Sequence, residues 1–194
     1  MTLVSIAAIV ACAVLLTLLA TSSSKDDAKK LADDRSAAAS VANTFVNALG
    51  TYDKTMLHGT TMPVYRANVE AVLTPKFTVA FESEGAPKAE QAVAAAGLKE
   101  AVRVWSTGVV AISADQATVV VVGSLTDSVP KTAGKTDYQS LGETPFRTII
   151  TLDKIGGKWL VDGQTPVEGI PPMASSTPSS TPSASSKPTS GATK

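Results

Sequence analysis

The sequence predicts an α+β protein, because a block of helices along residues 25–97 is followed by a block of strands along residues 98–168. Across residues 25–49 apolar side chains recur every three or four positions, the spacing of a helix with one buried face. From residue 98 β-branched residues dominate, and the four valines 119–122 are typical of a covered strand. This order favours helices packed on one face of a curved antiparallel sheet.

Four helical segments are expected. The first follows a break at Ser22–Ser24, with Ser24 as its cap, and ends at Gly50. The others span residues 64–73, 75–81 (opened by Pro75) and 89–96, with a loop at 51–63 that holds one helical turn and a connector at 82–88.

Strands are expected at residues 102–112, 117–125, 145–153 and 158–167, with a polar loop at 127–144. Ile155-Gly156-Gly157 predicts a hairpin turn, because glycine supplies the backbone angles that short hairpins need. In the last strand, alternation places Trp159 and Val161 on one face and Leu160 on the other. Trp159 is expected to pack into or over a cone formed by sheet and helices, and Asp162 is expected to end the strand in solvent.

Both ends of the chain differ from this domain, which we place at residues 23–170. Residues 1–22 are read as a transmembrane anchor, since residues 3–20 carry no charge and would cover about 27 Å of a bilayer about 30 Å thick. A cleaved signal peptide lacks a basic leader and a good cleavage site here. A lipoprotein reading at Cys12 would leave eight apolar residues on the mature protein. An uncleaved single-pass anchor in the lipid bilayer fits best.

The orientation of the anchor is set by two conflicting signals. Lys25, Lys29, Lys30 and Arg35 follow it, so the positive-inside rule places the domain in the cytoplasm. The two residues before the anchor leave almost nothing to translocate, and residues 171–194 form a Ser/Thr/Pro-rich tail with the composition of a disordered extracytoplasmic spacer. We expect a cell-membrane protein with its domain outside the cytoplasm.

Composition excludes several classes of function. Lys plus Arg and Asp plus Glu number 17 each, so no basic surface favours nucleic acid. One histidine, His58, and one cysteine, Cys12, make a dedicated metal site implausible. No nucleotide-binding or nucleophile-elbow motif occurs, so no cofactor is expected.

No catalytic residue is predicted, and the protein is expected not to be an enzyme. The acidic residues weighed as acid–base groups all fall near element ends or on helix surfaces: Asp53, Glu70, Glu82, Glu84, Asp115, Asp153 and Asp162. Four aromatic residues remain as candidates for a cone pocket or for packing: Tyr52, Tyr65, Trp105 and Trp159.

Three stretches carry a resemblance to a family: SVANTFVNALGTYDKTML, STGVVAISADQATVVVV and FRTIITLDKIGGKWLVDGQTPV. In this order behind an N-terminal anchor, they resemble the Mce-associated membrane proteins of actinobacteria, which accompany mammalian-cell-entry (Mce) lipid-import systems. The resemblance covers residues 25–168. The nearly absent cytoplasmic segment and the Ser/Thr/Pro tail depart from the family pattern.

This resemblance implies a cone-shaped domain like nuclear transport factor 2, also found in SnoaL-like proteins. It further implies one membrane pass, a domain outside the cytoplasm and an accessory role in envelope lipid import, with Mce complex proteins as partners. A homo-oligomer formed through the sheet is a separate expectation. The chain also resembles, more distantly, scaffold subunits of type IV secretion and conjugation machines. A SnoaL-like ligand-binding protein or enzyme is the alternative of a different class, and it predicts a closed pocket with converging polar groups.

Overall fold

The computed structural model describes the backbone of residues 2–132 and 135–167, and side chains within these ranges from residue 25 onward. The helical elements are α1 (Thr2–Leu49), a 3₁₀ turn (Lys54–Met56), α2 (Pro63–Glu70), α3 (Pro75–Ala80), a π-helical turn (Phe81–Gly85) and α4 (Ala86–Ala96). The strands are β1 (Lys99–Ile112), β2 (Gln116–Pro130), β3 (Tyr138–Ile155) and β4 (Lys158–Pro166).

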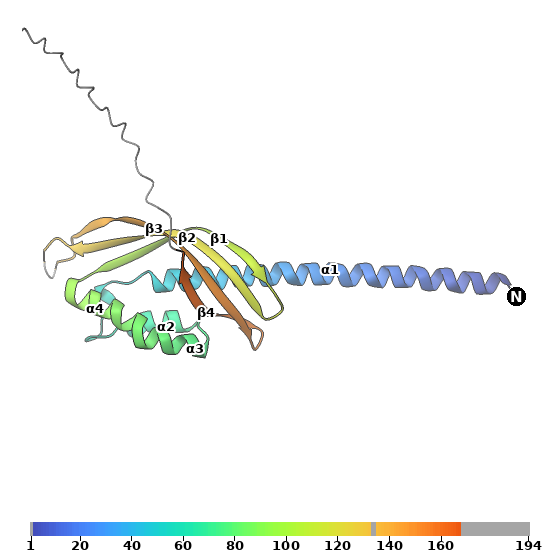
Figure 1. The fold of residues 1–194 in the computed structure, drawn as a ribbon, viewed down its shortest axis with the longest axis horizontal. Helices are drawn as coiled ribbons and strands as arrows, with labels where there is room; N and C mark the ends of the chain where they lie inside the picture. The colour runs from blue at the N-terminus through green and yellow to red at the C-terminus, as the bar shows by residue number, and fades with distance from the viewer. Residues whose placement is uncertain (1, 133–134, 168–194) are drawn as a thin grey trace, which may run out of the picture.

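The four strands form one antiparallel sheet in the order β1-β2-β3-β4, and α1 to α4 lie together on one side of it (Figure 1). The mixed helix and antiparallel-sheet class predicted from the sequence is therefore confirmed. The core lies between the sheet and the helices. Its largest fully buried side chains include Phe45, Met62, Tyr65, Ile150 and Leu152.

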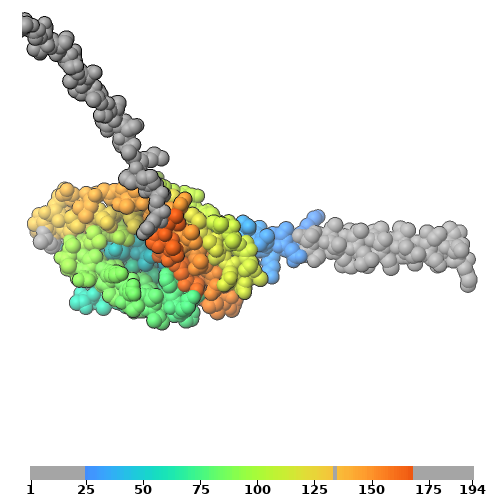
Figure 2. Space-filling model, in the orientation of Figure 1, coloured from blue at the N-terminus to red at the C-terminus, as the bar shows by residue number. Residues whose placement is uncertain are grey.

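Helix α1 runs without interruption from Thr2 to Leu49, so the predicted break at Ser22–Ser24 is wrong. A serine inside a helix costs only a few tenths of a kcal/mol relative to the best helix-forming residues, and about 0.7 kcal/mol at most. The helical turns on either side outweigh this cost. Residues 25–37 are exposed except for half-buried Asp34, and they project from the body of the domain (Figure 2). From Ala38 onward the helix enters the core with a face of Ala38, Ala42 and Phe45.

The predicted anchor, residues 3–20, lies outside the residues whose side chains the structure describes. Within the described part of the chain, none of the helices combines the length and the apolar character that crossing a membrane requires.

The predicted connector at residues 82–88 is wrong, because α3, the π-helical turn and α4 follow one another directly. The wider turn accommodates Pro87 at the start of α4, where a missing N–H is tolerated. The N–H of Ala86 donates to the carbonyl of Phe81 across this turn. A Cβ at Gly85 would lie 2.9 Å from Cδ2 of Phe81, so glycine also fits the packing here.

The loop predicted at residues 127–144 is mostly strand. β2 continues to Pro130 and β3 begins at Tyr138, with pairs such as Asp127 with Gly142 and Pro130 with Tyr138. β1 likewise begins at Lys99 rather than at residue 102. These extensions are polar because much of their surface meets water, so their hydrogen bonds rather than apolar alternation define them.

The hairpin turn predicted at Ile155-Gly156-Gly157 is confirmed, with φ of +58° at Gly156 and +81° at Gly157. Trp159 and Val161 are both buried, on the one face that alternation predicted they share. The prediction that Asp162 ends the strand in solvent is wrong. Its carboxylate accepts a 2.8 Å hydrogen bond from Oγ1 of Thr74 and pairs with Lys76, because the start of α3 packs against β4.

Candidate functional site: the outer face of the sheet

Three of the four aromatic candidates lie in the core. The rings of Tyr52 and Tyr65 pack edge to face with their centroids 5.3 Å apart, and Phe81 continues the contact at 5.8 Å from Tyr65. Trp159 is 5% exposed and stacks under the ammonium of Lys154, 5.1 Å from the ring centroid. These side chains fill the space between sheet and helices. Trp105, in contrast, is 52% exposed.

Two bulges in edge strand β1 decide where its side chains point. The register with β2 shifts between Val104 and Ser106 and again between Val109 and Ala111, which leaves Trp105 and Val110 without a cross-strand partner. Each bulge inserts one residue and reverses the alternation. Thr107 therefore faces the helices, where its hydroxyl donates to Oδ1 of Asn43 on α1.

The same bulges place two apolar side chains on the side of the sheet that faces away from the helices. There Trp105 and Val110, the latter 65% exposed, join side chains of β2 and β3 that alternate with the buried core. We call this surface the outer patch, and its members are Trp105, Val110, Val120, Val122 and Ile149.

No helix of the described residues packs on the outer patch (Figure 1). Val120 lies between Gly108 on β1 and Ile149 on β3, so the patch is continuous across three strands. Arg147 stands beside it, paired in register with Val122. An apolar centre with a charged rim is the usual composition of a protein-binding surface.

The edges of the sheet are less suited to pairing with another chain. Backbone hydrogen bonds join Tyr52 to Glu100 at the start of β1, and the segment before α3 bridges Val161 on β4. The two bulges distort the rest of the β1 edge, and bulged edges oppose strand addition. The face of the sheet is therefore the better candidate for an interaction than its edges.

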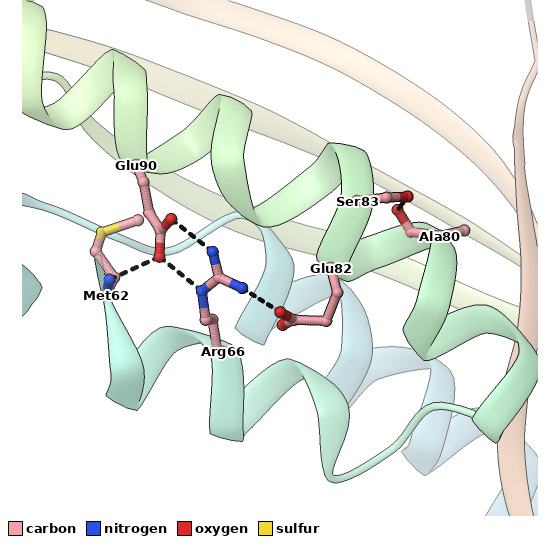
Figure 3. Close-up of polar contacts among 6 residues, drawn as sticks. All are labelled: Met62, Arg66, Ala80, Glu82, Ser83 and Glu90. Carbon is pink, nitrogen blue, oxygen red and sulfur yellow. Dashed lines mark hydrogen bonds and ion pairs between the residues drawn. The ribbon is translucent and has the colours of Figure 1, made fainter. Parts of the chain in front are cut away.

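A charged network ties α2 to the helices that follow it (Figure 3). Nε and Nη2 of Arg66 donate to the two carboxylate oxygens of Glu90, each at 2.7 Å, and the N–H of Met62 donates to the same carboxylate at 2.7 Å. Nη1 of Arg66 also pairs with Glu82. The hydrogen bond from Arg66 lowers the pKa of Glu90 despite its burial. Each of the three guanidinium nitrogens of Arg66 donates to a carboxylate, so this network holds α2 to the π-helical turn and α4.

A second ion pair fixes the direction of the projecting part of α1. The ammonium of Lys154, on the β3–β4 hairpin, pairs with Asp34 on the helix, and this hydrogen bond lowers the pKa of Asp34. Because Lys154 also lies over Trp159, the helix, the hairpin and the core are joined at one point.

His58 is exposed and its backbone bridges Thr61. Among the described residues, no cluster of His, Cys, Asp and Glu side chains could hold a metal ion.

Sequence reasoning missed two acidic residues. Glu100 and Asp127 are directly opposed across β1 and β2, in the segments read as a helix-to-strand junction and as a loop. Polar residues extend β1 back to Lys99 and β2 on to Pro130. With these longer strands, Glu100 and Asp127 would have been predicted as cross-strand neighbours.

No protein family matches this sequence, and no curated protein matches it. Among solved structures, the intermembrane space region of the chloroplast protein ARC6 is 12% identical over 66% of this chain and 95% of that chain, with a TM-score of 0.41. An Ntf2 like protein involved in plasmid conjugation is 15% identical over 69% of this chain and 48% of its own, with a TM-score of 0.40. A periplasmic fragment of TraM is 7% identical over 66% of this chain and 92% of that fragment, at 0.42. Similarities of this size carry no argument about function.

Proposed function

We propose that this protein is a non-enzymatic, membrane-anchored interaction subunit of a cell-envelope transport assembly, with a nuclear transport factor 2-like domain and an Mce-type lipid-import system as its assembly. The observation that carries the proposal is the outer patch, where Trp105 and Val110 expose apolar surface on an otherwise complete domain. Large exposed apolar residues gathered on one face mark binding surfaces more often than scattered ones do.

The residues behind the Mce resemblance support a shared fold rather than a shared partner. Tyr52 lies in the core, Asp53 caps the 3₁₀ turn through the N–H of Thr55, and Trp159 and Val161 are buried. A partner must instead be recognised by exposed side chains. The outer patch supplies exposed side chains of this kind. The identity of the captured partner therefore tests the Mce assignment, and variants of the patch test the binding surface.

Affinity capture of the full-length protein from detergent-solubilised membranes tests the proposal. Wild type is expected to recover Mce-family subunits, and Trp105→Ala and Val110→Thr are expected to lower that recovery about tenfold, as for interface residues worth more than 1 kcal/mol each. Val79→Thr is the matched control, because Val79 is 69% exposed on α3, away from the patch. Val79→Thr and Val110→Thr both replace one methyl group of valine by a hydroxyl group, so the two variants differ only in position.

Three other results would contradict this proposal. Equal recovery by all variants would remove the outer patch as the binding surface. Recovery of conjugation or type IV secretion subunits would replace the Mce assembly with that alternative. A second copy of this chain as the sole captured protein would indicate homo-oligomers through the sheet.

The location of the domain outside the cytoplasm is part of the proposal. It is supported by the uncharged residues 3–20 and the composition of the tail. In a Cys12→Ser background, which removes the one native cysteine, Ser113→Cys places a thiol in the exposed β1–β2 turn. A membrane-impermeant maleimide added to intact cells is expected to label it. Labelling only after lysis would place the domain in the cytoplasm, as the positive-inside rule implies.

A further inference from the structure

One groove remains where α1 ends against the sheet. It measures about 230 Å³ and lies between the last turns of α1 and all four strands. Its walls are mainly apolar and include Val46, Leu49, Val102, Leu125, Phe146 and Pro166. This volume is below the roughly 300–1,000 Å³ of pockets for drug-sized molecules, so a small ligand fits it.

Gly50 keeps this groove open at the helix end. It follows the last residue of α1, and its N–H donates to the carbonyl of Val46 at 3.0 Å. A Cβ at this position would lie 3.0 Å from Cβ of Val102 and 3.1 Å from Cδ2 of Leu125. A larger residue here would therefore press on Val102 and Leu125, two of the residues that line the groove.

A pair of carboxyl groups lies at the β1 end of the groove. Glu100 lines the groove and is the cross-strand partner of Asp127. The hydroxyl of Tyr52 donates to Oε2 of Glu100 at 3.0 Å, whereas Oδ1 of Asp127 is buried with no hydrogen-bond partner among the described residues. None of the ion pairs among the described residues includes either carboxyl group.

Two adjacent carboxyl groups without a cation are an unbalanced arrangement. Buried charges in proteins are ordinarily paired, because removing a lone charge from water is costly. Burial raises the pKa of Glu100, and the neighbouring Asp127 adds to this while the hydrogen bond from Tyr52 opposes it. Burial therefore favours the protonated form of Glu100, and a cation bound beside it would favour the ionised form.

We propose that this groove binds a small amphiphile with a primary ammonium head, which pairs with Glu100, and a short aliphatic chain, which lies against the apolar walls. An ammonium supplies the missing positive charge and three N–H donors for the carboxyl pair. On the β3 side, the side chains of Phe146 and Thr148 face the groove, whereas that of Arg147 between them alternates toward the outer patch.

The dependence on pH follows from the groups around Glu100. These are Tyr52 from the segment after α1, Tyr65 from α2 and Asp127 from β2. Both tyrosines keep their protons, because burial raises the pKa of each. Since an alkylammonium stays charged below about pH 10, its binding strengthens as the pH rises and Glu100 loses its proton.

Titration of the full-length, ¹⁵N-labelled protein in nanodiscs tests this proposal, with hexylamine, hexan-1-ol and hexanoate as probes. At pH 8 hexylamine is expected to bind at least about tenfold more tightly than hexanol, with amide shifts concentrated at Gly50, Glu100 and Leu125. Glu100→Gln is expected to remove this preference and its pH dependence. Glu84→Gln removes the same charge at an exposed site and is expected to change neither.

The proposal is overturned if hexanol or hexanoate binds as tightly as hexylamine, or if the shifts lie outside the groove. It is equally overturned if Glu100→Gln keeps the preference. Leu125→Phe provides a second variant that fills the groove without touching the carboxyl pair. Leu125→Phe is expected to weaken the binding of hexylamine and of hexanol alike. If this variant binds hexylamine as tightly as the wild type does, the ligand lies outside the groove.

Discussion

The contact between Arg66 and Glu90 allows a quantitative prediction about stability. Replacing Arg66 by methionine keeps much of the side-chain volume but leaves the carboxylate of Glu90, itself 5% exposed, with only the N–H of Met62 as donor. Removing one partner of a fully buried pair costs about 3–5 kcal/mol. Because the Arg66 side chain is 22% exposed, we expect about 2–3 kcal/mol at pH 7.

This loss is expected to shrink as the pH falls. In the wild type, Arg66 lowers the pKa of Glu90, so the pair stabilises the fold above the unfolded pKa of about 4.3 and loses this contribution as the pH falls through the lower folded value. In Arg66→Met that lowering is absent, and burial favours protonated Glu90. The variant therefore takes up its proton at a higher pH than the wild type.

Urea unfolding of full-length wild type and Arg66→Met, followed by circular dichroism at pH 7 and pH 4, measures both effects. Lys88→Met is the matched control, because Lys88 forms an exposed pair with Glu84 at 4.0 Å, and such pairs contribute about 0–1 kcal/mol. A loss below about 0.5 kcal/mol at pH 7 would refute the reasoning, since it is the size expected of any surface substitution. An equal loss at both pH values would refute the role of Glu90 ionisation.

Three further predictions concern other parts of the domain. Burial raises the pKa of Glu100, so folding favours its protonated form. The free energy of unfolding of the wild type is therefore expected to fall as the pH rises from about 4.3 through the raised value. Glu100→Gln is expected to remove this slope in urea titrations between pH 4 and 8. Gly123→Ala would drive a Cβ into the carbonyl oxygen of Arg103 and is expected to cost about 1–3 kcal/mol, whereas Gly108→Ala, with no atom within 4 Å of its Cβ, serves as its control in the same assay. Lys154→Met breaks the ion pair with α1 and is expected to speed amide hydrogen exchange in the projecting part of that helix without moving the global unfolding midpoint.

The elements with a strong apolar period could be predicted from the sequence. The buried face of α1, the valine run of β2 and the alternation around Trp159 each follow one periodic pattern that the core enforces. The turn at Gly156 and Gly157 has its own local chemistry. In all of these, the signal lies within a few neighbouring residues.

The bulges in β1 could not be predicted in this way. Strict alternation from Val102 would turn residues 102, 104, 106, 108, 110 and 112 toward the helices. The structure instead pairs Thr107 and Val109 with the buried residues of β2, and Val110 faces outward. A bulge changes the parity of a strand, and β-branched residues on both faces hide that change in the sequence.

The charged contacts were also beyond sequence reasoning. Arg66 and Glu90 are 24 residues apart, and Lys154 and Asp34 are 120 apart. Each residue taken alone fits an exposed helix or turn, so nothing local distinguishes a pair from two solvated charges. Only the packing of α2 on α4, and of the β3–β4 hairpin on α1, brings these groups together.

The residues that carry the Mce resemblance lie largely in the core, so they say little about a binding partner. In GKWLVD, Trp159 and Val161 are buried, and Asp162 holds the start of α3 through Thr74. Exchanging these residues would disturb the packing of β4 against α3 and the core in this domain. Trp105 and Val110 carry no such constraint, because they are the extra residues of two bulges and are 52% and 65% exposed. Substitutions at these two positions can therefore change the partner while the core remains the same. In the capture experiment, the comparison that identifies the binding surface is the one between wild type and the Trp105 and Val110 variants.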